Sequence, residues 1–61
     1  MSTYVVDADK LVKAAYNVEF PQTVDSQEFT SVIDWLVSVG FSKSIALDLF
    51  HTGAITVTYL D

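Results

Sequence analysis

Cysteine and arginine are both absent from this chain of 61 residues, and histidine occurs once. Without cysteine there is no disulfide, and His51 has no thiolate partners with which to form a closed zinc site. Core packing or a partner must therefore provide the stability that small domains often take from crosslinks. The lack of cysteine also favours an intracellular location.

Positive charge is scarce, because three lysines stand against eight carboxylates and leave a net charge of −5. A chain of this charge is repelled by other anions. We therefore expect a protein partner with a basic surface, and no direct binding of nucleic acid.

Long apolar runs are missing as well. The most hydrophobic stretch, residues 32–39, is interrupted by Asp34 and is far shorter than the roughly 18 residues that span a bilayer. Residues 1–4 show neither the basic region nor the apolar core of a signal peptide. These features favour a soluble protein of the cytoplasm with no membrane association.

Catalytic motifs are absent too. The two glycines, Gly40 and Gly53, form no phosphate-binding loop. Asp7 and Asp9 are a pair of carboxylates without the apolar surroundings that acid–base catalysis requires, and no serine or acid stands at a triad spacing from His51. We therefore expect no enzyme, no metal and no cofactor.

Apolar side chains are plentiful, since 51% of the residues are hydrophobic and 13% are aromatic. Disordered acidic tails lack such residues, so this chain should fold. A domain of this length buries only about 60% of the surface that its unfolded chain exposes. We expect a single domain, residues 1–61, of modest stability.

Strands are predicted at both ends of the chain. Residues 4–6 are a short β-branched and aromatic run, and residues 54–60 alternate strictly between their two faces. The segment around Pro21, residues 18–24, is either a linker or an edge strand.

A first helix is predicted from Asp7, as its N-cap, to about Asn17. Its buried stripe is expected at helical spacing and comprises Leu11, Ala14, Ala15 and Val18.

A second helix is predicted to start at Asp25, because this N-cap places Glu28 at the third helical position and lets Val24 pack on Phe29. Gly40 ends it. Trp35 and Val37 lie on the flanks of its inward stripe, which comprises Phe29, Val32, Ile33 and Leu36.

Ser42 is the predicted N-cap of a third helix that runs to about Thr52, where Gly53 stops it. This helix forms a short-turned hairpin with the second. The terminal strands gain hydrogen bonds most economically by pairing with each other, with residues 18–24 as an optional third strand. We therefore predict a small two-layer α+β domain with three short helices covering a sheet; the alternative is a helical bundle with an irregular C-terminal segment.

Half of the carboxylates already have a local role at predicted helix N-termini. Asp34 and Asp48 do not, and in the predicted hairpin they are equally far from the turn and lie side by side. With Asp25 and Glu28 they form a carboxylate ridge, and Trp35 beside it is a candidate anchor. Such a ridge either keeps the protein soluble or imitates a phosphate backbone and attracts a groove lined with Lys and Arg.

A hydrophobic-Gly-Phe sequence at residues 39–41, followed by Ala46, Leu49 and residues 52–53, resembles the first loop and second helix of ubiquitin-associated domains. The resemblance implies an interaction module that binds through Gly40 and Phe41. It covers about residues 32–53 and then ends, because such domains continue into a helix and this chain continues into a predicted strand. A helix C-cap with its apolar contact explains the same residues.

Over its whole length the chain resembles the small acidic inhibitors that bacteriophages encode, anti-CRISPR proteins among them, in its acid excess, its lack of cysteine and its lack of an enzymatic motif. The resemblance implies a non-catalytic inhibitor in the bacterial cytoplasm. Its partner would be the basic, DNA-contacting surface of a defence assembly such as a CRISPR surveillance complex, which it blocks as a DNA mimic or by steric exclusion. No residue role follows from the resemblance.

A third possibility is a weak homodimer. The apolar residues of the third helix spread almost all round its axis, so that part of them is expected at the surface: Ile45, Ala46, Leu47, Leu49 and Phe50.

Overall fold

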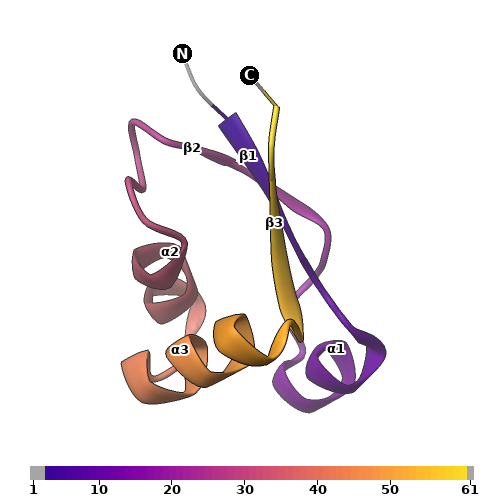
Figure 1. The fold of residues 1–61 in the computed structure, drawn as a ribbon. Helices are drawn as coiled ribbons and strands as arrows, with labels where there is room; N and C mark the ends of the chain where they lie inside the picture. The colour runs from indigo at the N-terminus through magenta and orange to yellow at the C-terminus, as the bar shows by residue number, and fades with distance from the viewer. Residues whose placement is uncertain (1–2, 61) are drawn as a thin grey trace.

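The computed structural model describes residues 3–60. Strands Thr3–Ala8 (β1), Gln22–Asp25 (β2) and Ile55–Tyr59 (β3) form an antiparallel sheet in the order β2-β1-β3, as Figure 1 shows. The terminal strands therefore pair with each other as predicted. The segment left open in the sequence supplies the edge strand β2, so the sheet has three strands.

Three helices complete the α+β fold: Lys10–Tyr16 (α1), Val32–Val39 (α2) and Lys43–Thr52 (α3). In Figure 1, α1 and α3 lie at the end of the sheet where β1 ends and β3 begins, and α2 stands to one side. The predicted fold class is confirmed, and the helical bundle is excluded.

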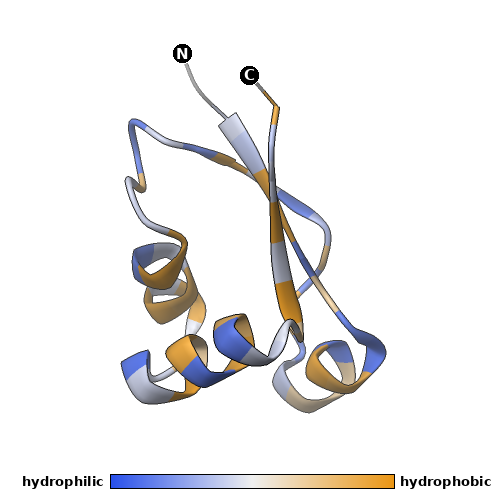
Figure 2. Ribbon diagram, viewed as in Figure 1, coloured by the Kyte–Doolittle hydropathy of each residue, from blue (hydrophilic) through white to orange (hydrophobic). Residues whose placement is uncertain are grey.

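The register of the sheet decides which side chains are buried. Tyr4 lies opposite Val24 on one neighbour and Tyr59 on the other, and Val6 lies opposite Val57. Opposite residues share a face, and along β3 apolar and polar residues alternate (Figure 2). The face of the sheet that is turned towards the helices contributes side chains to the hydrophobic core. The buried apolar side chains of this core are Tyr4, Val6, Val12, Val24, Val32, Trp35, Leu36, Phe41, Ala46 and Ile55.

The first helix starts later than predicted, and Asp7 is not its N-cap. Asp7 remains in β1, where it pairs with Thr56 of β3. Asp9 caps α1 instead, because its carboxylate accepts a hydrogen bond of 3.0 Å from the Val12 amide. The ladder with β3 extends β1 to Ala8, and this tertiary pairing outweighs the local capping signal at Asp7.

The buried face of α1 also differs from the prediction. Val12 is buried and Tyr16, one turn later, packs against the core, whereas the side chain of Leu11 is 80% exposed. The two alanines of the predicted stripe are exposed, and Val18 is half-buried. Val12 and Tyr16 have the same helical spacing as the predicted stripe, so periodicity alone did not identify the inner face of so short a helix.

The second helix begins at Val32, not after Asp25. Asp25 ends β2, and its Oδ1 accepts a 2.8 Å hydrogen bond from the Gln27 amide in a local turn. Ser31 is the actual N-cap, and its hydroxyl accepts from the Ile33 amide at 3.1 Å. The residues of a capping box are also turn formers, and here the turn prevails because Asp25 belongs to the sheet.

The end of α2 agrees with the prediction. Gly40 has φ of 122°, its amide donates to the Val37 carbonyl at 3.2 Å, and the Phe41 amide donates to the Leu36 carbonyl at 3.0 Å. This pair of bonds is a Schellman motif, and Phe41 and Leu36 both lie in the core, as its apolar contact requires.

The predictions for α3 and β3 are confirmed. Ser42 caps α3 by accepting from the Ile45 amide at 3.2 Å, and Gly53 ends it with φ of 81°. The predicted terminal strand follows at once as β3.

Candidate acidic binding surface

Three of the predicted site residues lie in one segment. Asp25, Glu28 and Asp34 all belong to the stretch from the last residue of β2 to the first turn of α2, and we call residues 25–34 the acidic connection. The other two predicted site residues, Trp35 and Asp48, have different surroundings.

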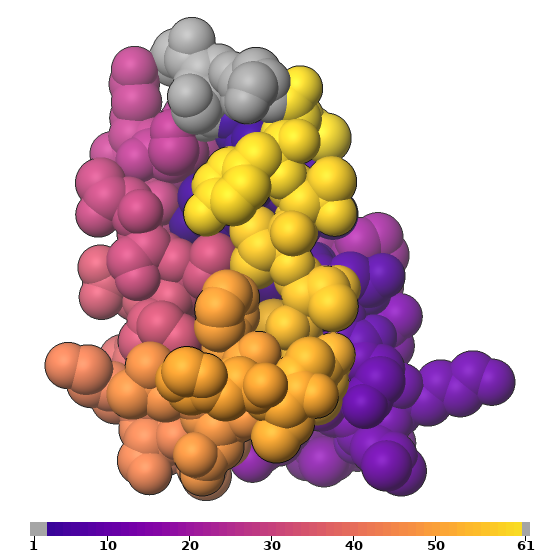
Figure 3. Space-filling view, in the orientation of Figure 1, coloured from indigo at the N-terminus to yellow at the C-terminus, as the bar shows by residue number. Residues whose placement is uncertain are grey.

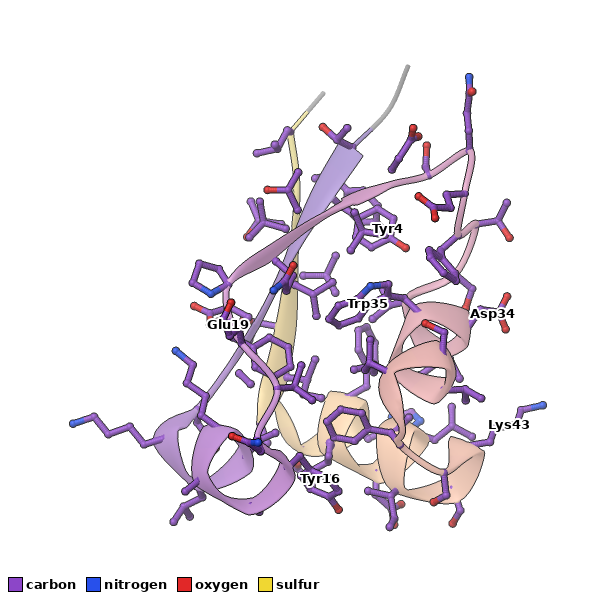
Figure 4. The ribbon with its side chains drawn as sticks, turned by 180° about the vertical axis from the view of Figure 1, so that it is seen from behind. Tyr4, Tyr16, Glu19, Asp34, Trp35 and Lys43 are labelled. Atoms are coloured by element: carbon purple, nitrogen blue, oxygen red, sulfur yellow. The ribbon has the colours of Figure 1, made fainter. Side chains whose placement is uncertain are left out.

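Hydrogen bonds give the acidic connection a defined shape. The carbonyl of Asp25 accepts from the amides of Glu28 and Phe29, both at 3.0 Å. Further along, the Tyr4 hydroxyl donates to the Phe29 carbonyl at 2.8 Å and ties the connection to the central strand. Figure 4 shows Tyr4 reaching towards this side of the molecule, where Asp34 projects outwards from α2. The carboxylates are therefore carried on an ordered segment.

No basic side chain neutralises these carboxylates. Within residues 3–60 the one ion pair joins Lys13 to Asp7 at 3.3 Å. Glu28 and Asp34 are exposed, and Asp25 is half-buried. Between Lys13 and Lys43 the chain contains no basic residue, so every charged side chain in this part of the sequence is a carboxylate.

The electrostatic effect of Asp34 reaches the Tyr4 hydroxyl. Burial is the main cause that raises the pKa of Tyr4 above its ordinary value, and the neighbouring Tyr59 and Asp34 raise it further. The hydroxyl therefore stays protonated and continues to donate to Phe29 well into the alkaline range.

Asp48 lies apart from this segment, on α3, where it is exposed. It follows the buried Ala46 by two positions, about 200° round the helix, and so faces away from the core. Figures 1 and 4 show α3 running across the lower end of α2, whereas Asp34 lies in the first turn of α2, away from that end. The side-by-side placement of Asp34 and Asp48 therefore has no support from the helix packing.

Trp35 is not a surface anchor, because its side chain is only 8% exposed. Its ring and that of Phe20 pack edge to face with the centroids 6.0 Å apart, and Figure 4 shows Trp35 pointing into the interior. The spacing of Val32, Trp35 and Leu36, at positions i, i+3 and i+4 of one helix, was the signal in the sequence for this burial.

Phe41 is also buried, with 3% of its side chain exposed, and its ring centroid lies 4.3 Å from that of Tyr16. An interface like that of ubiquitin-associated domains would need this ring at the surface. After α3 the chain enters β3, whereas those domains continue into a helix. The alternative site at Gly40 and Phe41 therefore loses its main contact residue.

Asp7 and Glu19 do not extend the site. The pKa of Asp7 is lowered, chiefly by the hydrogen bond from the Ala8 amide at 2.8 Å and then by Lys13, and these causes outweigh its desolvation. Glu19 projects from the opposite side of the molecule from Asp34 in Figure 4.

Other types of site are not found in the described part of the chain. Residues 3–60 contain no group of three or more His, Asp or Glu side chains placed to hold a metal, and they enclose no pocket. Among the same residues no helix is long and apolar enough to cross a bilayer.

Apolar side chains are exposed on α3, as the sequence suggested, and also on other parts of the molecule. On α3 the side chains of Ile45, Leu47 and Phe50 are exposed. Sequence reasoning missed Tyr59 and Leu60, which are 69% and 58% exposed at the C-terminal end of β3. The sequence showed that both residues belong to an alternating segment. It did not show that the helices leave this end of the sheet uncovered.

No protein-family model, no curated protein and no solved structure matches this chain.

Proposed function

We propose that this chain is a non-enzymatic acidic binding protein whose acidic connection occupies a basic, nucleic-acid-contacting surface on a protein partner. The observation that supports this most is the set of three carboxylates, Asp25, Glu28 and Asp34, on one hydrogen-bonded segment without a basic neighbour. The proposed setting is the cytoplasm of a bacterial host, and the proposed partner is a defence assembly such as a CRISPR surveillance complex.

Electrostatics explains why such a surface would suit such a partner. A net charge of −5 on 61 residues produces a field that speeds encounter with a basic groove. Carboxylates held in place by the backbone lose little conformational entropy on binding, in contrast to those on a disordered acidic tail. Binding of this kind weakens as salt increases, because exposed charges are screened.

The proposal is tested with a purified CRISPR surveillance complex. Binding of the chain is measured by biolayer interferometry at low and high salt, with the complex either free or already bound to target DNA. We expect binding that decreases with salt and is lost when DNA occupies the groove. Binding that is unaffected by bound DNA, or the absence of binding to the complex, would contradict the proposal as stated.

The site is tested with two matched double variants. Glu28→Gln with Asp34→Asn removes two charges from the acidic connection, and Glu19→Gln with Asp48→Asn makes the same chemical changes elsewhere on the surface. We expect the first variant to weaken binding about tenfold or more and the second to have a much smaller effect. Equal losses would mean that total charge, and not the acidic connection, determines binding.

A further inference from the structure

β3 is an edge strand with one open side. It pairs with β1 on one side only, and in Figure 3 it lies uncovered on the face of the molecule towards the viewer. From Ile55 to Leu60 it carries no charge and no proline, the usual devices that keep an edge strand from pairing with another chain. The other edge strand, β2, is shorter and is bounded by Pro21 and Asp25.

The ladder shows which backbone groups of β3 are unused. Flanking bonds run from the Leu60 amide to the Thr3 carbonyl at 3.1 Å and from the Asp9 amide to the Ala54 carbonyl at 2.9 Å. Hydrogen bonding alternates along an antiparallel pair, so Thr56 and Thr58 direct their amides and carbonyls towards β1. The same groups of Ile55, Val57 and Tyr59 point to the open side.

We propose that this open edge binds a second copy of the chain, with β3 pairing antiparallel to the partner's β3 about a twofold axis at Val57. In this register Val57 faces its own equivalent, and Ile55 faces Tyr59 of the other copy. Each of these pairs exchanges two backbone hydrogen bonds, which uses all the outward-facing groups. The two sheets then become one continuous sheet of six strands.

Side-chain chemistry favours a second copy over an unrelated partner. On the helix side, the register sets β-branched and aromatic residues opposite one another, including Tyr59, which is 69% exposed in the single chain. On the other side it sets Thr56 opposite Thr58 of the second copy. No charged residue faces a like charge along the strand, although each copy carries a net charge of −5. The repulsion between copies is therefore long-range, and salt should strengthen the dimer.

Amide hydrogen exchange, followed by NMR at low and high protein concentration, tests the pairing directly. In the single chain the amides of Thr56 and Thr58 should exchange slowly, and those of Val57 and Tyr59 quickly. As concentration rises, sedimentation should show doubled mass, and the amides of Val57 and Tyr59 should become slow. A single-chain mass up to millimolar concentration, or a dimer in which these two amides still exchange quickly, would overturn the proposal. Protection of the same amides only by an extended segment of another protein would overturn it too.

Two double variants test the register. Thr56→Lys with Thr58→Lys sets lysines opposite each other across the twofold axis, whereas Thr56→Lys with Thr58→Glu sets opposite charges there. In both, the new residue at 56 lies beside Asp7 of its own chain. We expect the first variant to raise the dimer Kd about tenfold, although it lowers the net negative charge, and the second to leave it unchanged or lower it. Circular dichroism at low concentration checks that both fold. Equal Kd values for the two variants would exclude this register.

Discussion

Tyr4 joins the sheet to the acidic connection through one side chain. Its ring is buried between the sheet and the helices, 5.8 Å from the ring of Tyr59, and its hydroxyl holds the Phe29 carbonyl. A tyrosine in a predicted strand was visible in the sequence. Its hydrogen bond to a residue 25 positions away was not, because only the folded chain brings the two together.

The raised pKa of Tyr4 leads to a prediction at alkaline pH. Because the folded pKa lies above the unfolded value near 10, the folded chain holds this proton more tightly, and stability falls as pH rises through that range. Urea unfolding between pH 8 and 11, compared with a Tyr4→Phe variant, measures the effect. At neutral pH the variant should be about 0.5–1.5 kcal/mol less stable, and its further loss at alkaline pH should be smaller than that of the parent chain. Parallel pH profiles would contradict this assignment.

Phe41 and Leu11 provide a second residue-scale test, because they are apolar residues with opposite surroundings, 3% and 80% exposed. Phe41→Ala should cost about 3–5 kcal/mol, since it leaves a cavity against Tyr16 and Leu36. A chain of this length has a total stability of about 3–9 kcal/mol, so the variant should lose a large part of its free energy of unfolding. Leu11→Ala should change stability by less than about 0.5 kcal/mol in the same urea titration. A large cost at Leu11 would mean that α1 turns its other face inwards.

At the scale of whole elements, local signals were accurate where no distant partner competed. The cap at Ser42 and the terminators at Gly40 and Gly53 were all predicted correctly from the sequence. The N-caps at Asp7 and Asp25 were wrong, and both residues lie in strands. An N-cap contributes only about 1 kcal/mol, so the pairing of several strand residues can override it.

The two glycines that end α2 and α3 allow a matched test of backbone conformation. Beyond its own and its adjacent residues, neither has an atom within 4 Å of the place where a β-carbon would be, so alanine adds no clash with the rest of the protein and only the positive φ opposes it. Gly53→Ala should cost about 1–2 kcal/mol, as expected for a left-handed residue. Gly40→Ala should cost more, because its φ of 122° lies outside the left-handed helical region. Thermal and urea unfolding give both values, and a smaller cost at Gly40 would contradict the argument from its φ of 122°.

At the scale of the whole molecule, charge acts against folding. Eight carboxylates and three lysines share a chain of 61 residues, and within residues 3–60 there is one ion pair. Compaction brings the like charges closer together, so the folded state carries a repulsion that the unfolded chain partly escapes. The same excess of negative charge underlies both the proposed affinity for a basic partner and the expected modest stability.

Salt should therefore stabilise the fold. We expect the urea midpoint at pH 7 to rise when NaCl is raised from about 20 to about 300 mM, because the screening length shortens to a few ångströms. Low protein concentration keeps dimer formation out of the measurement. Repeating the titration near pH 4, where protonation removes much of the negative charge, should reduce the effect. An equal rise at both pH values would point to a general solvent effect of the salt.

The sequence by itself determined the charge, the absence of crosslinks, the α+β class, the ends of α2 and α3, and the terminal strands. These features depend on composition or on residues a few positions apart. Only the tertiary structure decided where α1 and α2 begin, that residues 22–25 form a strand, and that Trp35 and Phe41 are buried. It also showed that Asp25, Glu28 and Asp34 belong to the connection between β2 and α2, whereas Asp48 lies on α3. Burying one large apolar side chain stabilises a fold by about 1.5–3 kcal/mol, more than most local signals, so the packing of distant segments determines these features.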